Sequence, residues 1–185
     1  MAHPILKDAE NRMKKAVDSN RDELAKIRTG KASPALLDSV RVNYYGSPVP
    51  LKQVSSINTP EPRLITVQPW EKNLIGEIEK AILKADLGFN PQNDGTTIRI
   101  PIPQLTEERR QEFVKICRKL AEDGRVAVRN VRRDALEQLK KAKKDGELPE
   151  DEEKAYEKEL QKLTDKQIGQ IDEILKHKET EIMQT

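Results

Sequence analysis

The sequence predicts an α+β protein in which an elongated three-helix bundle is interrupted by a small inserted β/α/β domain. Apolar residues recur at every third or fourth position toward both ends of the chain, which is the period of amphipathic helices. In the middle, apolar and polar residues alternate, which is typical of half-buried strands. Only 35% of residues are hydrophobic and 36% are charged, so long exposed helices are favoured over one large core. We therefore assign 1–30 to the first helix, 31–104 to the inserted domain and 105–185 to the other two helices.

The first helix is predicted over 4–29. Pro4 suits its first turn, where the missing N–H group would have no partner in any case. Gly30 can adopt the left-handed conformation that ends a helix. Ser33 and Pro34 then form an N-cap and first-turn pair, which predicts a short helical turn. The apolar stripe of the first helix consists of Leu6, Ala9, Met13, Ala16, Val17, Leu24 and Ile27.

The inserted domain is predicted to mix short strands with one helix, because the hydrophobic period changes several times between prolines and glycines. The predicted elements are strands over 40–45, 51–57, 64–67 and 97–100, a turn over 46–48 and a helix over 72–85. Trp70 stands between Pro69 and Glu71. We expect Trp70 to cover the core of this domain, and the alternative is an anchor for a partner.

Helical spacing resumes after Thr106, a good N-cap, and continues until Gly146 and Pro149 interrupt it. The apolar stripe of this long helix is Phe113, Cys117, Leu120, Gly124, Val128, Val131, Ala135, Leu139 and Ala142. A third helix begins near Glu150, with Tyr156, Leu160, Leu163, Ile168, Ile171, Leu175 and Ile182 on its inner face. Each helix has one apolar face and is unstable alone, so the three are expected to close into a bundle.

Charge is distributed unevenly although the net charge is only +2. Residues 109–133 hold nine basic and three acidic side chains, whereas residues 146–185 hold six lysines and twelve acids. Arginines line one side of the long helix at Arg110, Arg118, Arg125, Arg129 and Arg132. Arginine suits phosphate recognition, and the absence of interleaved aromatic residues favours the backbone of a folded RNA. The alternatives are a solvated face or salt bridges to the acidic third helix.

Arg28 and Lys31 flank the first crossing into the inserted domain. In a bundle, the end of the first helix adjoins the start of the long helix near Arg109 and Arg110. We therefore expect the positive surface to continue around this crossing, and the alternative is a pair of ordinary surface cations.

Several classes of protein receive no support from the sequence. The single cysteine, Cys117, excludes an internal disulfide, and His3 and His177 have no partners at metal-ligand spacing. There is no glycine-rich phosphate loop and no serine elbow, so we expect neither an enzyme nor a cofactor. No apolar run is long enough to span a membrane, and the first residues resemble neither a signal nor a transit peptide. We expect a cytoplasmic monomer.

Collinear motifs across nearly the whole chain resemble those of bacterial ribosome recycling factors. The most specific stretch runs from Val126 to Ala135. The other matching segments are 26–30 with 32–34, 44–46 with Pro48 and 50–51, 86–88 with 90–91, and 105–110.

This resemblance implies an L-shaped molecule whose bundle forms one arm and whose inserted domain forms the other. It implies binding to ribosomal RNA of the large subunit after termination, followed by subunit splitting together with elongation factor G and GTP. The inserted domain would meet elongation factor G and pivot. A helical chaperone or protein-binding adaptor is the alternative function, and it predicts binding that depends little on salt.

The resemblance also assigns residues. Arg132 would be the leading RNA contact, followed by Arg129 and Arg28, with Arg110, Arg133 and Lys31 in support. Lys31 stands where the family usually has arginine, which weakens bidentate phosphate contact there. Separately from the resemblance, the two crossings between bundle and insert predict a hinge that comprises Gly30, Ala32, Ser33, Pro101, Pro103, Gln104 and Leu105. Gln104 replaces a frequent proline, which predicts a looser hinge.

Overall fold

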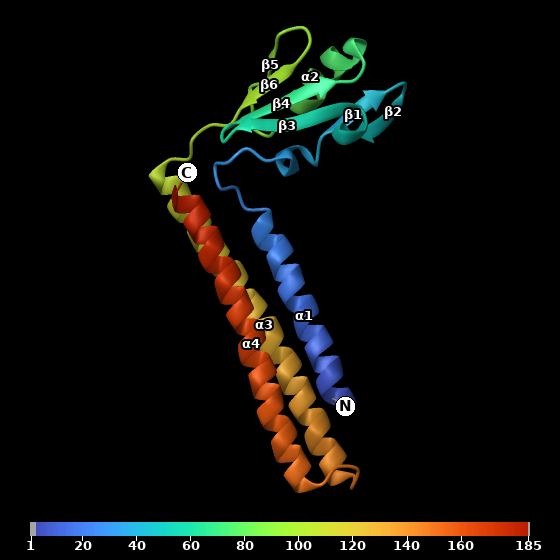
Figure 1. The fold of residues 1–185 in the computed structure, drawn as a ribbon, viewed down its shortest axis with the longest axis vertical. Helices are drawn as coiled ribbons and strands as arrows, with labels where there is room; N and C mark the ends of the chain where they lie inside the picture. Colours follow the sequence, from blue (N-terminus) through green and yellow to red (C-terminus); the bar gives the residue numbers. More distant parts are fainter. Residues whose placement is uncertain (1–2, 185) are drawn as a thin grey trace. The chain divides into compact units, whose positions relative to one another are not determined.

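The computed structural model describes residues 3–184, which form two compact units. The first unit joins residues 3–29 to Glu107–Gln184, and the second comprises Gly30–Thr106. Figure 1 shows long helices in the first unit and a small sheet with a helix in the second. The predicted α+β class is therefore confirmed.

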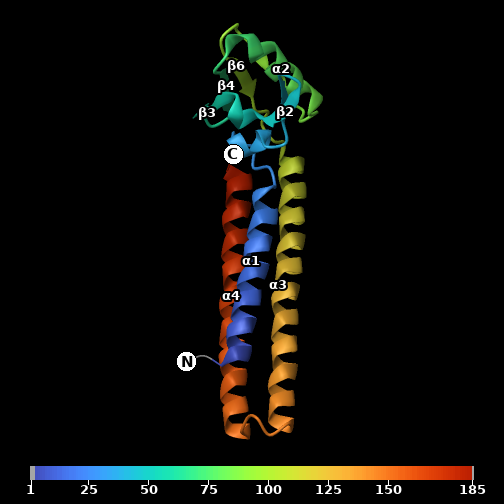
Figure 2. The same cartoon turned by 90° about the vertical axis from the view of Figure 1, so that its right-hand side faces the viewer.

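The first unit is a bundle of three helices, α1 (Pro4–Ala25), α3 (Glu107–Lys144) and α4 (Glu150–Gln184). They lie side by side in both Figure 1 and Figure 2. The 38 residues of α3 extend over about 57 Å at the usual rise of an α-helix. The buried seam that joins the three helices consists chiefly of Leu6, Ala9, Met13, Val17, Ala121, Val128, Ala135, Leu139, Leu160 and Ile171.

The helix ends differ in part from the sequence prediction. The first helix ends at Ala25 and not at residue 29, because Ile27 donates its N–H to the carbonyl of Leu24 at 3.2 Å and tightens the last turn. Gly30 does have a left-handed backbone, with φ +83°, but it lies in the following segment. Gly146, with φ +77°, ends α3 as predicted.

The stripe predicted for α3 is buried except at Phe113 and Leu120, which are half-buried, and Ala121 lies in the core beside Leu120. The seam of α4 is less apolar than predicted. Thr164 and Gln167 are fully buried within it, and the Thr164 hydroxyl donates to the carbonyl of Leu160 at 2.8 Å. Four of the predicted inner residues of α4 are only half-buried: Tyr156, Leu163, Ile168 and Leu175.

Gly124 lets α1 and α3 approach closely. The side-chain amide of the buried Asn20 donates from Nδ2 to the carbonyl of Leu120 at 2.7 Å. A Cβ atom on residue 124 would lie 2.7 Å from both Cγ and Nδ2 of Asn20. The glycine, which is unfavourable inside a helix by about 1 kcal/mol relative to alanine, is therefore explained by this contact.

The second unit contains a four-stranded antiparallel sheet in the order β3-β4-β6-β5 and a separate β1-β2 hairpin. Its strands are β1 (Arg41–Tyr44), β2 (Ser47–Pro50), β3 (Ser55–Glu61), β4 (Leu64–Pro69), β5 (Gln92–Asn93) and β6 (Ile98–Pro101). Its helical segments are η1 (Pro34–Leu37), η2 (Leu51–Gln53), η3 (Lys72–Leu74) and α2 (Ile75–Lys84). Ile78 and Ile82 of α2 join Ile65, Val67 and Ile98 of the sheet in one core.

Three sequence predictions in this unit were wrong. The hairpin turn is Tyr45-Gly46, with φ values of +48° and +87°, so the predicted turn at 46–48 overlaps strand β2. Residues 51–53 form a helical turn, and the following strand starts only at Ser55. Trp70, expected to cover the core, is 66% exposed. The predicted N-cap at Ser33 is confirmed, because its side chain accepts the N–H of Ala35.

Candidate nucleic-acid interface

The arginine line of α3 borders α4, and the two helices share ion pairs there. Arg118 contacts Glu179 of α4 at 2.7 Å, and Arg125 contacts Asp172 of α4 at 2.6 Å. These contacts match the alternative interpretation, in which arginines beside the seam form salt bridges to the acidic third helix. Arg118 and Arg125 therefore act first as structural residues of the bundle.

Arg129 is held by an acid of its own helix. Its Nη1 donates to Oε1 of Glu122 at 3.1 Å, while Arg125 donates to the other carboxyl oxygen of Glu122 at 3.0 Å. These two hydrogen bonds lower the pKa of Glu122 below its ordinary value. Because the Arg129 side chain is still 38% exposed, a phosphate could compete with Glu122 for it.

Arg132 differs from its neighbours because its partner is neutral. Its Nη1 donates to Oε1 of Gln161 on α4 at 3.2 Å, and the Gln161 amide donates in turn to Asp165 at 2.9 Å. Gln161 thus orients the guanidinium without neutralising its charge. The Nε atom of Arg132 is buried and has no hydrogen-bond partner among the residues that the structure describes. The sequence did not point to Gln161, because its role depends on how α3 and α4 align.

Two other predicted contacts have different surroundings. Arg133 is exposed, and within residues 3–184 it forms no salt bridge or side-chain hydrogen bond. Arg110 donates from Nη1 to the carbonyl of Met183 at 3.0 Å, where a cation is favourable because α4 ends. Arg110 therefore has a structural role, and its contact with RNA stays a prediction.

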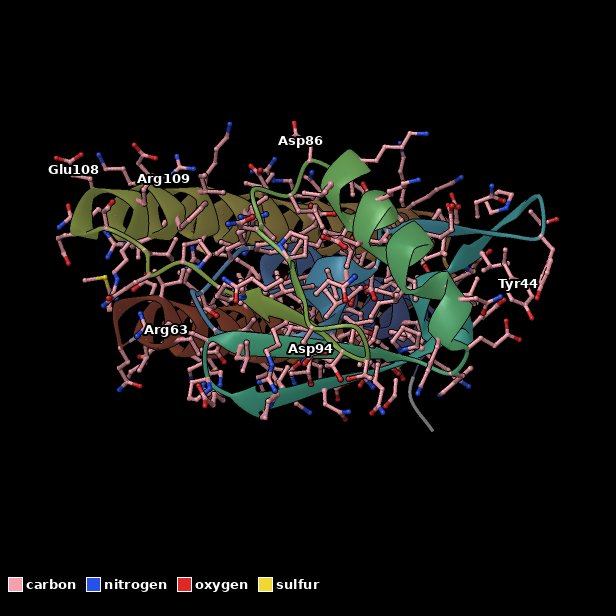
Figure 3. The ribbon with its side chains drawn as sticks, turned by 90° about the horizontal axis from the view of Figure 1, so that it is seen from above. Tyr44, Arg63, Asp86, Asp94, Glu108 and Arg109 are labelled. Atoms are coloured by element: carbon pink, nitrogen blue, oxygen red, sulfur yellow. The ribbon has the colours of Figure 1, made fainter. Side chains whose placement is uncertain are left out.

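Arg28 and Lys31 belong to different compact units. Arg28 is exposed and follows Ile27, which packs in a small core cluster with Phe113 near the start of α3. At this end of α3, Glu108 and Arg109 point away from the helix (Figure 3), and Arg109 donates to Glu112 at 2.9 Å. Within the first unit, Arg28 thus lies near the start of α3, as its sequence position suggested. Whether Lys31 adds to the surface stays a prediction.

The predicted hinge residues are bound to the second unit to different extents. The N–H of Ala32 donates to the carbonyl of Pro62 at 2.7 Å, and Ser33 caps the helical turn that follows. Pro101 is the last residue of β6, opposite Leu64 of β4. By contrast, Pro103, Gln104 and Leu105 lie outside the described helices and strands.

Other kinds of site receive little support. No group of three or more His, Cys, Asp or Glu side chains among residues 3–184 is arranged to hold a metal ion. Burial raises the pKa of the Cys117 thiol, which keeps it protonated and unreactive. In the described part of the chain, no helix combines the length and apolar character needed to cross a membrane.

The fold and the arginines together define a class of protein: a helical bundle with a cationic flank, carrying a second α+β unit between its first two helices. A family model described as ribosome recycling factor matches residues 20–183. The chain belongs to the ribosome recycling factor family.

Relatives and solved structures agree with this assignment. The chain is 55% identical to the ribosome-recycling factor of Desulforamulus reducens and 53% identical to that of Bacillus cytotoxicus, each over 184 residues and 100% of both chains. A solution structure of a ribosome recycling factor is 45% identical, covers 100% of both chains and has a TM-score of 0.78. A second structure, with 47% identity, 96% coverage of both chains and a TM-score of 0.64, contains the T. thermophilus factor and E. coli elongation factor G bound to the E. coli post-termination complex.

Proposed function

We propose that this protein recycles ribosomes after termination. It binds the large subunit of the post-termination complex and, with elongation factor G and GTP, promotes disassembly into subunits, which frees mRNA and tRNA. Membership of the ribosome recycling factor family supports this function, as does the similar factor bound with elongation factor G on the post-termination complex. We propose that the protein acts in the cytoplasm.

We assign ribosomal RNA contact to the arginine surface, by which we mean Arg129, Arg132 and Arg133 of α3. One observation supports this choice most strongly: Arg132 is oriented by the neutral Gln161, so its positive charge is not cancelled by an acid in contact with it. Arg133 is exposed and unpaired within residues 3–184, and Arg129 has only Glu122 of its own helix. We propose Arg28, Arg110 and Lys31 as secondary contacts with RNA.

The inserted domain, 31–104, is proposed to meet elongation factor G and to pivot. Hydrogen bonds from Ala32 to Pro62 and from Ile102 to Arg63 tie both edges of the insert to the β3-β4 turn. Rotation is therefore easiest at Gly30 in the first connecting segment and at 103–105 in the second connecting segment. This hinge is narrower than the set of residues proposed from the sequence.

The chain contributes contacts and movement, while elongation factor G hydrolyses the GTP. We propose that it acts as a monomer without a cofactor or a metal ion. Unassisted GTP hydrolysis by the purified protein would contradict this division of roles.

Co-sedimentation with purified ribosomes across a salt series tests the arginine surface. If ~4–6 phosphates are contacted, log affinity should fall against log salt with a slope of about −3 to −4. Arg132→Ala should weaken binding about 10- to 150-fold, since a hydrogen bond to a charged group contributes roughly 1.5–3 kcal/mol. Arg21→Ala is the matched control, because Arg21 is an exposed arginine of α1 paired only with Asp18 in its own helix.

Two results would decide against the proposal. Binding that is indifferent to both salt and Arg132 would favour the protein-adaptor alternative. An equal loss of binding in Arg132→Ala and Arg21→Ala would show a general effect of charge and not a specific surface.

A further inference from the structure

A small pocket opens on the second unit, and none of its lining residues belongs to the arginine surface. Its volume is about 120 Å³, which suits a single side chain. Residues from four neighbouring segments line it, among them Tyr44, Val49, Val54, Trp70, Glu71 and Leu74. Figure 3 shows Tyr44, the last residue of β1, at the edge of this unit.

Aromatic side chains are concentrated and exposed at this pocket. Trp70 is 66% exposed, and Tyr45, whose ring lies 4.6 Å from that of Tyr44, is 77% exposed. The chain has only six Phe, Trp and Tyr residues; Tyr44 and Trp70 line the pocket, and Tyr45 lies next to Tyr44. Exposed Trp and Tyr side chains beside a pocket are typical of the energetic centres of protein interfaces.

The pocket is also held in shape by the backbone. The N–H of Trp70 donates to the carbonyl of Val54 at 3.2 Å, and the carbonyl of Glu71 accepts the N–H of Leu74 at 3.0 Å. Tyr44 is fixed in strand β1, opposite Ser47. A ligand would therefore find the aromatic and acidic groups already in place.

One carboxylate gives the pocket its charge. Oε1 of Glu71 accepts a hydrogen bond from the Tyr44 hydroxyl at 3.3 Å, and within residues 3–184 Glu71 forms no salt bridge. The negative charge of Glu71 raises the pKa of the Tyr44 phenol, which keeps the phenol protonated as a donor. The pocket thus combines aromatic faces with an acid that lacks a cation.

We propose that this pocket binds an arginine side chain presented by a protein partner. A guanidinium stacks on aromatic faces and pairs with a carboxylate at the same time, which an ammonium does less well. RNA is a poorer fit, because Glu71 would repel phosphates and residues 30–106 hold eight basic and seven acidic side chains, without the excess of the arginine surface. The proposal goes beyond the recycling function and does not depend on the arginine surface.

Trp70 is the only tryptophan, so the fluorescence of the intact protein reports on this pocket directly. We would titrate the protein with N-acetylarginine amide and with the neutral isostere N-acetylcitrulline amide. Arginine should produce a saturable change, and citrulline should bind at least about fivefold more weakly. Glu71→Gln should remove this preference, whereas Glu61→Gln, an exposed acid of β3 in the same unit, should retain it. Equal responses to both amides, or a preference retained in Glu71→Gln, would overturn the proposal.

The partner is tested by placing the photo-crosslinker benzoylphenylalanine at Tyr45 in the full chain. Irradiation with purified post-termination ribosomes and elongation factor G should give a crosslinked peptide that contains arginine. Its yield should fall severalfold with Glu71→Gln and remain with Glu61→Gln. Crosslinks to RNA, or a yield insensitive to Glu71, would overturn the proposal. The crosslinking experiment rests on the proposed function, whereas the titration uses the isolated protein. A failure of the arginine pocket can therefore be distinguished from a failure of the proposed function.

Discussion

Replacing Gly124 by alanine should destabilise the helical bundle, although alanine is the better helix former. In an isolated helix the exchange would be favourable by about 1 kcal/mol. In the bundle, the new Cβ would lie 2.7 Å from Cγ and Nδ2 of Asn20 and 3.1 Å from its Oδ1. Carbon atoms do not persist at such distances, so Asn20 or the helices must move.

The size of the effect follows from what Asn20 loses. Its hydrogen bond to the Leu120 carbonyl, 2.7 Å long, contributes about 1 kcal/mol net. Overpacking a buried seam costs a further ~1–3 kcal/mol. After subtraction of the helix-propensity gain, Gly124→Ala should lower the free energy of unfolding by about 1–3 kcal/mol. In an Asn20→Ala background the clash is absent, so the same substitution should raise it by about 1 kcal/mol.

Urea unfolding followed by far-ultraviolet circular dichroism tests this reversal of sign in a double-mutant cycle. The four proteins are the wild type, the two single variants and the double variant. Their unfolding free energies are compared provided that these depend on urea concentration with similar slopes. We expect a coupling energy of at least about 2 kcal/mol. If Gly124→Ala stabilises both backgrounds equally, the contact with Asn20 does not explain the glycine.

Three further variants test predictions about charge and backbone. Gln161→Glu should pair Arg132 with an acid and weaken ribosome binding about fivefold in co-sedimentation, the effect of an exposed ion pair of about 1 kcal/mol. Glu122→Gln should release Arg129 and strengthen binding at low salt. The pKa of Glu122 is lowered in the folded protein, so the ion pairs of Glu122 stabilise the fold at pH values above the ordinary pKa of a glutamate. This stabilisation is lost as the pH falls through the lowered pKa. Urea unfolding midpoints measured against pH should therefore depend less on acid in Glu122→Gln than in the wild type. Gly46→Ala should destabilise the second unit by about 1 kcal/mol in a tryptophan-fluorescence melt, because φ is +87° there.

Each of these predictions has an outcome that contradicts it. Unchanged binding by Gln161→Glu would mean that the neutral partner of Arg132 is irrelevant to docking. Weaker binding by Glu122→Gln would mean that Glu122 positions Arg129 instead of competing for it. A Gly46→Ala variant as stable as wild type would mean that the hairpin turn tolerates a side chain, as it does at Tyr45, whose φ is +48°.

The helices could be predicted from the sequence because their apolar period is long and regular. The stripe from Cys117 to Ala142 is buried almost as its spacing indicates. The helix ends and the β1-β2 hairpin were less predictable. Tyr45 is not a residue type expected at positive φ, so the turn was placed one position late and strand β2 was missed.

The surroundings of the arginines could be predicted only in part. Composition indicated a cationic helix and an acidic one, but not that Arg125 faces Asp172 while Arg132 faces Gln161. Those contacts depend on how two helices are aligned along each other. The spacing of residues within one helix gives no information about that alignment. Hydrophobicity likewise suggested burial for Trp70, whereas Trp70 directly follows the end of β4 and is 66% exposed.

The ion pairs between α3 and α4 also bear on how the chain avoids misfolding. Arg118 and Arg125 are seven residues apart, as are their partners Glu179 and Asp172, so the pairs repeat every two helical turns. If α4 slipped by four residues, Arg125 would face either Lys176 or Ile168, and neither neutralises it. A collapsed intermediate with shifted helices would thus lose both pairs at once, which disfavours this kinetic trap during folding.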